Sequence, residues 1–198
     1  MTEEKTGEAE TRDLILDQAE ALIRHVGRKK TNVEDIAEKL GMSRAYIYRF
    51  FPSRAAIDRG VYARHADQSL SEAIARSGTC CQASTQLVTL LEHLHKRIRN
   101  DAAHAANVHA LSVAAHLEDW LETRQHLQLL KDAIETILGD VPNPAEFVLD
   151  RHGAAQAVVE AMTSFLHPVL VGQRLEEGQE DAMRLQTAFV LRALGMKG

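Results

Sequence analysis

The sequence predicts an all-α protein of 198 residues. Apolar residues recur at three- and four-residue steps along most of the chain, which is the spacing of an amphipathic helix. No window alternates between apolar and polar residues with period two, and no βαβ pattern or glycine-rich phosphate loop is present. With 45% hydrophobic and 26% charged residues, the chain resembles globular proteins that bury a sizeable core. We expect about nine helices in two domains, residues 1–53 and 54–198.

Three helices are expected in the first domain. The first covers Leu14–Val26, where apolar residues share one face, and Gly27 follows at the place of a left-handed C-cap. The second covers Asn32–Leu40, with a capping asparagine at its start and Gly41 after its end. The third covers Ser43–Phe50, because serine is a good N-cap and a proline follows two residues after the helix.

The second domain begins with a long helix, which we expect from Arg54 to about Arg76. Pro52-Ser53 marks its start, and Ser77-Gly78-Thr79 marks its end. The next helix is indicated by an apolar stripe at positions 87–98, and a break is expected at Asn100-Asp101.

Further helical regions follow. An alanine-rich stretch covers 101–116, and a helix from Glu118 to Gly139 carries apolar residues on one face. A break at Pro142-Asn143-Pro144 separates them from a very apolar helical segment, Ala145–Leu170. The last helix is expected over Glu180–Leu194.

Composition also limits where the protein works. No stretch approaches the roughly 18 apolar residues of a membrane span, and the opening MTEEKTGEAETRD lacks the apolar run of a secretion signal. We therefore expect a cytoplasmic protein that does not associate with a membrane. The two cysteines, Cys80 and Cys81, are adjacent and lack the spacing of a zinc or thioredoxin site. Inert thiols are favoured over a redox switch.

Charge is distributed unevenly. The whole chain has a net charge of −5, yet residues 24–64 carry ten lysines and arginines against four acidic residues. A basic block on an acidic chain is typical of a surface that faces phosphates, although a solvated face with this charge is the alternative.

Two short helices joined at Gly41-Met42 lie inside this basic block. This arrangement predicts a helix-turn-helix, whose second helix fits into the major groove of DNA. The run NVEDIAEKLGMSRAYIYRFFPSR at positions 32–54 resembles the DNA-binding signature of the TetR family of bacterial repressors. The resemblance covers Thr11–Tyr62 and is carried by the combination of I-A, G-x-S, Y-x-x-F and a basic residue after the turn.

The resemblance implies roles for individual residues. Ser43 and Tyr48 fall where the family contacts phosphates, Arg44 and Ala45 where it meets base edges, and Arg54 where it has a phosphate-binding lysine. Tyr46 replaces a small residue, Arg49 lies in a variable segment, and Asn32 can cap a helix or donate to phosphate. The candidate DNA-binding residues are Asn32, Ser43, Arg44, Ala45, Tyr46, Tyr48, Arg49 and Arg54.

Each assignment has a simpler alternative. Tyr48 and Phe50 have the helical spacing of core residues, and Arg44 and Arg49 have the character of solvated surface side chains.

The resemblance also implies that the second domain binds a small-molecule effector of unknown identity and forms a homodimer on a DNA operator. Ala145–Leu170 and the apolar face of 182–194 are suited to an isologous four-helix interface. An ordinary monomer core is the alternative.

Histidines are frequent, with ten in the chain and eight of them after residue 90. His109, His116, Trp120 and Arg124 share one face if the helix is continuous. We predict that they meet a segment bearing His152, Met162 and Phe165, so that a few donors line an apolar ligand site. Structural or surface histidines are the alternative for each.

No cofactor or metal is expected, because His93-x-His95 places its rings on different faces and no paired cysteines support a site. We therefore predict a ligand-responsive repressor that is not an enzyme. The rival hypothesis is a small all-α enzyme or metal-binding protein that uses the histidines of the second domain. No H-E-x-x-H or paired-carboxylate motif supports this rival.

Overall fold

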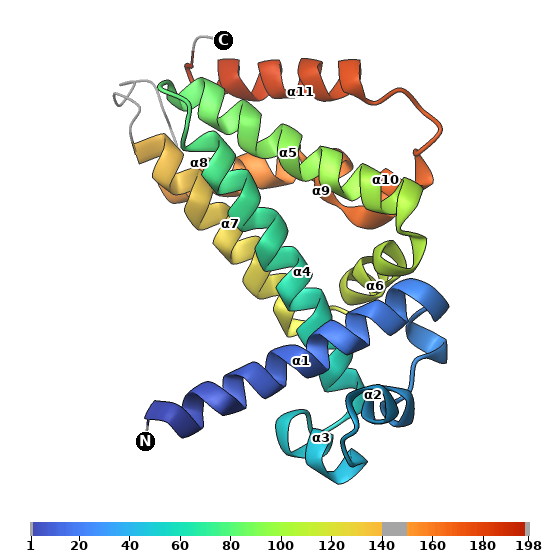
Figure 1. The fold of residues 1–198 in the computed structure, drawn as a ribbon. Coiled ribbons are helices and arrows are strands. Elements are labelled where there is room, and N and C mark those ends of the chain that lie inside the picture. The colour runs from blue at the N-terminus through green and yellow to red at the C-terminus, as the bar shows by residue number, and fades with distance from the viewer. Residues whose placement is uncertain (1, 140–149, 197–198) are drawn as a thin grey trace.

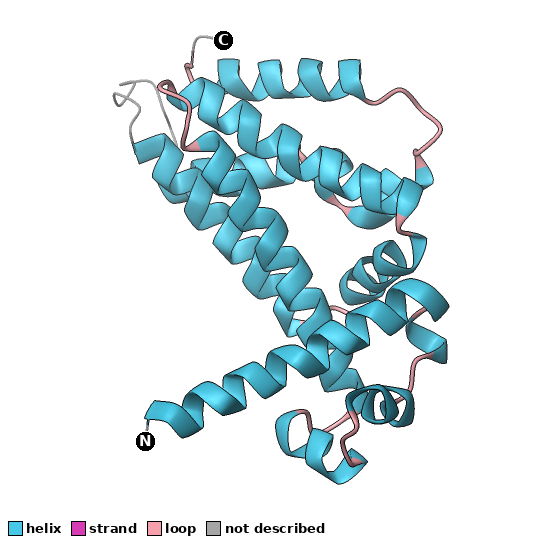
Figure 2. Ribbon diagram, viewed as in Figure 1, coloured by secondary structure: helices cyan, strands magenta, loops and turns pink. Residues whose placement is uncertain are grey.

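The computed structural model describes residues 2–139 and 150–196, and every regular element in these ranges is helical (Figure 2). The prediction of an all-α protein is confirmed. In chain order the elements are α1 (Thr2–Val26), the 3-10 helix η1 (Arg28–Lys30), α2 (Val33–Leu40), α3 (Arg44–Phe50), α4 (Arg54–Ser77), α5 (Ala83–His104), α6 (Ala106–Leu117), α7 (Leu121–Gly139), α8 (Arg151–Ala161), α9 (Thr163–Leu166), α10 (Pro168–Gln173) and α11 (Glu180–Ala193). None of these helices is long and apolar enough to cross a membrane.

The first three α-helices gather at one end of the molecule (Figure 1). Their core contains fully buried side chains from α1, α2, α3 and the start of α4, including Ile23, Ile36, Ile47 and Ile57. Gly41 follows α2 with a φ of 64°, a left-handed conformation that glycine adopts without strain. This turn sets α3 against α2 as the sequence predicts.

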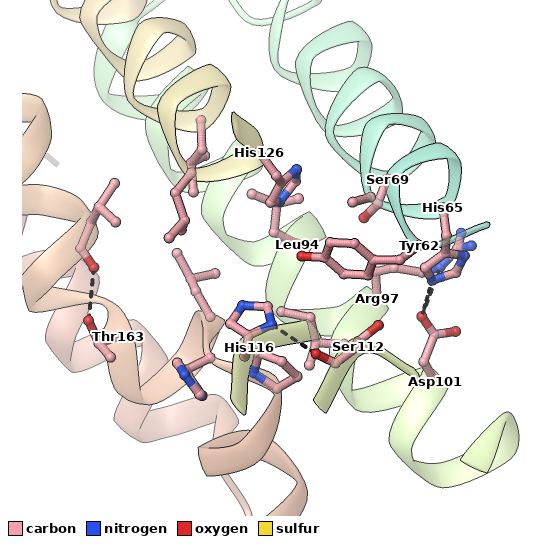
Figure 3. A pocket seen from close by; sticks show the side chains of 18 of the residues that line it. Tyr62, His65, Ser69, Leu94, Arg97, Asp101, Ser112, His116, His126 and Thr163 are labelled. Carbon is pink, nitrogen blue, oxygen red and sulfur yellow. Dashed lines mark hydrogen bonds and ion pairs between the residues drawn. The ribbon is translucent and has the colours of Figure 1, made fainter. Parts of the chain in front are cut away.

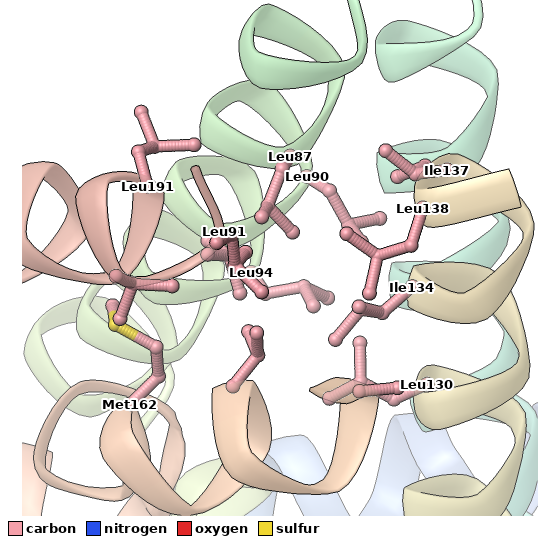
Figure 4. Close-up of a cluster of buried hydrophobic side chains, with 14 of the residues drawn as sticks. Leu87, Leu90, Leu91, Leu94, Leu130, Ile134, Ile137, Leu138, Met162 and Leu191 are labelled. Atoms are coloured by element: carbon pink, nitrogen blue, oxygen red, sulfur yellow. The ribbon is translucent and has the colours of Figure 1, made fainter. Parts of the chain in front are cut away.

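The second core lies among α4, α5, α7, α8 and α11 (Figure 4). Leucines of α5 face isoleucines and leucines of α7, and Met162 and Leu191 close the other side. Helix α4 belongs to both cores, since Ile57 and Val61 pack in the first and Leu70 and Ala73 in the second. It therefore joins the two ends of the molecule as one rigid element.

Two predicted boundaries are wrong. The expected break at Asn100-Asp101 is absent, because α5 continues to His104 and ends before Ala105. Asp101 is held in the helix by side chains around it: its carboxylate lies 2.8 Å from His65 Nε2 and 3.4 Å from Arg97 Nε. Helix α1 also begins earlier than the apolar spacing indicates, at Thr2 rather than Leu14.

The predicted apolar helix Ala145–Leu170 is also wrong as a single element. Residues 145–149 lie outside the described part, and the rest divides into α8, α9 and the start of α10. Pro168 occupies the first position of α10, where its missing N–H costs nothing, but it cannot continue a preceding helix. Accordingly, the described residues contain more helices than we expected.

A buried carboxylate connects the two domains. Asp58, in the first turns of α4, accepts hydrogen bonds from Arg28 Nε at 3.1 Å and from Arg54 Nη1. The other side of the Arg28 guanidinium donates to both oxygens of Glu118, just after α6, at 2.9 and 3.2 Å. We call Arg28, Arg54, Asp58 and Glu118 the Asp58 clamp.

Removing the charge of Asp58 tests the clamp. Asp58→Asn should lower the free energy of unfolding by about 3 kcal/mol, because two partly buried guanidinium groups lose their shared partner. Asp17→Asn is the matched control: Asp17 pairs with Arg64 at 2.6 Å but is mostly exposed, and its loss should cost less than about 1 kcal/mol. Urea unfolding followed by circular dichroism measures both, and equal losses would contradict a structural role for the clamp.

Candidate functional site

The outer surface of α3 carries most of the predicted DNA-binding residues. Ile47 is fully buried and anchors the helix, whereas the exposed positions are Arg44, Ala45, Tyr46, Tyr48 and Arg49. Tyr48 is 40% exposed, which removes the alternative that it is a core residue. Phe50, in contrast, packs partly against the core. The Arg49 guanidinium lies 5.5 Å from the centre of the Tyr46 ring, so a cation and an aromatic face stand together on this surface.

Asn32 and Ser43 hold the starts of the two helices. The Asn32 side chain accepts from the backbone N–H of Asp35 at 2.8 Å, and Ser43 Oγ accepts from that of Tyr46 at 3.1 Å. Both are N-caps, a role that the sequence predicts for them. Both remain exposed at the edge of the helix-turn-helix.

The Arg54 side chain makes contacts within the protein. Its guanidinium points inward, donates to the carbonyl oxygens of Thr31 at 3.1 Å and Arg28 at 3.2 Å, and pairs with Asp58. Sequence reasoning placed Arg54 on the DNA side because a basic residue stands there in the family motif. The acidic residue four positions later was the available sign of an inward ion pair.

A cavity of about 340 Å³ lies in the second domain, between α4, α5, α6, α7 and the α8–α10 segment. Its walls are mostly apolar and include Leu94, Ile98, Leu127, Leu130, Val159 and Leu166. Tyr62, His116 and His126 point toward the same space from three different helices (Figure 3). An apolar space with a few converging polar groups is what a site for a small organic molecule requires.

Five histidines line this cavity: His65, His109, His116, His126 and His167. Burial lowers the pKa of His116 and of His126 to about 4, and it also lowers the pKa of His109 and of His167. These four rings are therefore neutral near pH 7. His116 lies against His167, with ring centres 4.8 Å apart, and its Nδ1–H donates to the carbonyl oxygen of Ser112 at 2.9 Å.

Two of these rings have a free polar atom. Nδ1 of His126 and Nδ1 of His167 are buried and have no hydrogen-bond partner among the described residues. A buried polar atom without a partner costs about 1–3 kcal/mol. The remaining histidine of the cavity, His65, forms a hydrogen bond with the carboxylate of Asp101. The pKa of Asp101, which burial by itself would raise, is lowered by the contacts of Asp101 with His65 and Arg97.

Only His109 and His116 of the seven predicted ligand-binding residues line the cavity. The predicted continuous face ends at Leu117, because Asp119 has a φ of 47° and redirects the chain before α7. Trp120 consequently packs in the core of the first domain, where its ring meets Tyr62 and Arg28 and its Nε1–H donates to Glu118.

The other four lie elsewhere. Arg124 is exposed, and His152 is on the surface, with Nδ1 2.6 Å from Glu135. Met162 and Phe165 are buried in the second core. The sequence signal missed Tyr62 on α4, His126 on α7 and His167 between α9 and α10, because residues on separate elements share no spacing.

A metal centre is not formed by the described residues: no three of their His, Cys, Asp or Glu side chains are placed to hold an ion.

Comparison with known families gives two matches. A family model described as bacterial regulatory proteins, tetR family, matches residues 15–57. A second, described as the tetracyclin repressor-like C-terminal domain, matches residues 83–185. No curated protein matches the sequence.

Similar solved structures agree in fold. FadR from Thermus thermophilus, a TetR-family repressor in complex with lauroyl-CoA, has a TM-score of 0.62 at 16% identity over 92% of each chain. A TetR transcriptional regulator from Legionella pneumophila has a TM-score of 0.59 at 17% identity over 94% of this chain and 97% of that one. FadR from Bacillus subtilis, in complex with stearoyl-CoA, has a TM-score of 0.55 at 18% identity over 91% and 96%.

The neutral histidines predict a loss of stability in acid. Because folding lowers the pKa of His116 and His126 from 6.5 to about 4, the unfolded chain takes up protons first as the pH falls. Stability is complete above pH 6.5 and declines toward pH 4, by about 2 kcal/mol per ring between pH 7 and 5. His126→Gln should reduce this pH dependence in urea unfolding, whereas His104→Gln, at an exposed position, should leave it unchanged. A decline that is identical in both variants would contradict the assignment.

Proposed function

This chain belongs to the tetR family of bacterial regulatory proteins, and from that premise we propose that it is a cytoplasmic transcriptional repressor rather than an enzyme. Residues 1–53 form the DNA-binding domain, and residues 54–198 form the ligand-binding and dimerisation domain. The protein binds a palindromic operator as a homodimer and leaves it when a small molecule occupies the cavity.

The observation that carries this proposal is the exposed face of α3. A single buried residue, Ile47, anchors the helix, and the arginines and tyrosines around it have no role in the core. The major groove is about 12 Å wide and accepts one α-helix. Arginines on such a helix donate to base edges and phosphates, and tyrosine hydroxyls donate to phosphates.

Dimerisation is supported by the outer face of α11. Leu185 and Phe189 are 73% and 67% exposed, and Ala188 lies between them on the same face. Ala157 and Ala161 of α8 are exposed as well, and α8 packs beside α11 through a hydrogen bond from Gln186 to the carbonyl oxygen of Ala161. A two-fold pairing of α8 and α11 buries this face and places two recognition helices on one duplex.

The cavity favours an uncharged polar group on an apolar body. Its neutral imidazoles offer hydrogen bonds but no charge, and Arg97 is already paired with Glu72 and Asp101. Lys131 and Glu160 also line the cavity, and the Glu160 carboxylate accepts from the neutral amide of Gln156. A charged ligand would still lose its hydration among the mostly apolar walls. A hydroxyl or an acyl thioester carbonyl on an alkyl chain meets these requirements, and two of the similar structures hold acyl-CoA.

Helix α6 is placed to link the cavity to the DNA-binding domain. His109, Ser112 and His116 face the cavity, while Leu111 and Ala115 on another side pack in the core of the first domain.

Both ends of α6 are tied to the first domain. Asn107 donates to the carbonyl oxygen of Arg24 at 3.0 Å, and Glu118 binds Arg28 in the Asp58 clamp. A ligand that shifts α6 therefore changes the position of α3, which couples the two binding equilibria.

A mobility-shift experiment tests the proposal. Wild-type protein should retard a duplex taken from the DNA upstream of its own gene, and Arg49→Ala should weaken this binding about tenfold through the loss of one base or phosphate contact. Addition of 1-decanol or lauroyl-CoA should release the duplex, because each carries a neutral polar group on its alkyl chain, a hydroxyl in the first and a thioester carbonyl in the second. Decylamine should release less of the duplex, since its ammonium group would lose its hydration among mostly apolar walls.

Lys96→Ala is the control for Arg49→Ala, because it removes one exposed positive charge from α5, away from α3. Equal weakening by both variants, or no binding by the wild type, would contradict the proposal. Release by decylamine as strong as by 1-decanol would contradict the ligand class alone.

The dimer is tested by two neighbouring substitutions. Phe189→Asp should give folded monomers of 22.0 kDa in light scattering at micromolar concentration, whereas the wild type should have twice this mass. Val190→Asp should instead unfold the subunit, because Val190 is only 4% exposed and the charge would be buried without a partner. A wild-type protein with the monomer mass, or a Phe189→Asp variant that remains dimeric, would contradict this interface.

A further inference from the structure

One ion pair joins the two helices of the helix-turn-helix on its outer surface. Arg44, the first residue of α3, donates from Nη1 to Oε1 of Glu34, the second residue of α2. The two side chains are 57% and 55% exposed, so the pair stands on the surface that carries the other DNA-facing residues. Glu34 is an unexpected residue there, because a carboxylate repels the phosphates of DNA.

Three other polar side chains at this end of the helices already have contacts. The side-chain oxygens of Asn32 and Ser43 accept from the backbone as N-caps, and Arg49 lies over the ring of Tyr46. Of the two arginines on α3, Arg44 is therefore the one whose position is set by an ion pair with Glu34. Glu34 is itself favoured in the first turn of α2, where the helix dipole attracts negative charge.

We propose that Glu34 is a specificity-determining residue, which holds Arg44 toward a guanine edge and weakens its use as a simple phosphate contact. This inference rests on the proposed DNA-binding function. It concerns a residue that makes its contribution through Arg44 and needs no contact with DNA of its own.

The number of N–H donors on arginine explains how the Arg44–Glu34 pair favours a guanine edge over a phosphate. A guanidinium has five N–H donors, so Arg44 can keep one edge on Glu34 while another edge donates to O6 and N7 of guanine. These guanine atoms are neutral acceptors, and the nearby carboxylate does not oppose their binding. A phosphate brought to the same guanidinium carries a negative charge, and Glu34 repels it. Glu34 therefore weakens a contact between Arg44 and a phosphate more than a contact between Arg44 and a base.

The restraint of Arg44 by Glu34 in the free protein also favours binding to the operator over random DNA. A free arginine side chain loses rotamer freedom when it is fixed against a base, and this loss reduces affinity. Glu34 restrains Arg44 in the free protein, so less freedom remains to be lost at the operator. Random DNA, which accepts many orientations of Arg44, gains little from the same restraint.

Selection from a random duplex library, followed by affinity measurement, tests the inference. The wild-type protein should enrich an inverted repeat with a guanine at a fixed position in each half-site. Glu34→Gln should lower the ratio of operator to random-duplex affinity about tenfold, mainly through tighter binding to random DNA, and should weaken the guanine preference. In an Arg44→Ala background, Glu34→Gln should leave the ratio unchanged within about twofold, because the residue acts through Arg44.

Glu38→Gln is the matched control. It removes the same charge from an exposed position on the same helix, without an ion-pair partner among the described residues. Equal changes in the affinity ratio for Glu34→Gln and Glu38→Gln, or a Glu34→Gln effect that persists in the Arg44→Ala background, would overturn the inference and leave the proposed function intact. A wild-type protein that enriches no sequence would instead overturn both.

Discussion

The buried carboxylate of Asp58 determines how the DNA-binding domain is joined to the rest of the molecule. A carboxylate taken out of water costs several kcal/mol unless its charge and lone pairs are satisfied. Arg28 and Arg54 satisfy them here, and this requirement fixes η1 against the start of α4. Arg28 then extends to Glu118 and so holds the end of α6. Helix α3 shares its core with α2 and the start of α4, so the direction in which α3 faces outward depends on how these helices are held.

Helix α6 gives the second domain its connection to this clamp. The imidazoles on its cavity side remain neutral because they are buried, and two neighbouring rings keep unpaired nitrogens. The ties at Asn107 and Glu118 oppose movement of α6 alone. Occupation of the cavity and the orientation of α3 are therefore linked through one short helix, in the function that we propose.

Local signals predicted the helix-turn-helix well, because its geometry is set by neighbouring residues. Asn32, Ser43 and Gly41 act within one turn of their own positions, and they form the caps that the sequence predicts. Long-range contacts were not predictable in this way. The inward turn of Arg54 depends on Asp58 and two carbonyl oxygens, and the place of Trp120 depends on a single positive φ at Asp119. The cavity brings together residues from α4 to α10, and no spacing along one helix indicates such a set.

The central claim is that two copies of this chain present α3 to one duplex. Hydroxyl-radical footprinting of the protein on the duplex that it retards measures this directly, because it maps the sugars that each subunit covers. Two protected regions on one face of the duplex, with centres about 10–10.5 base pairs apart, are the result that a dimer of helix-turn-helix domains predicts. A single protected region, or uniform protection along the duplex, would contradict the claim.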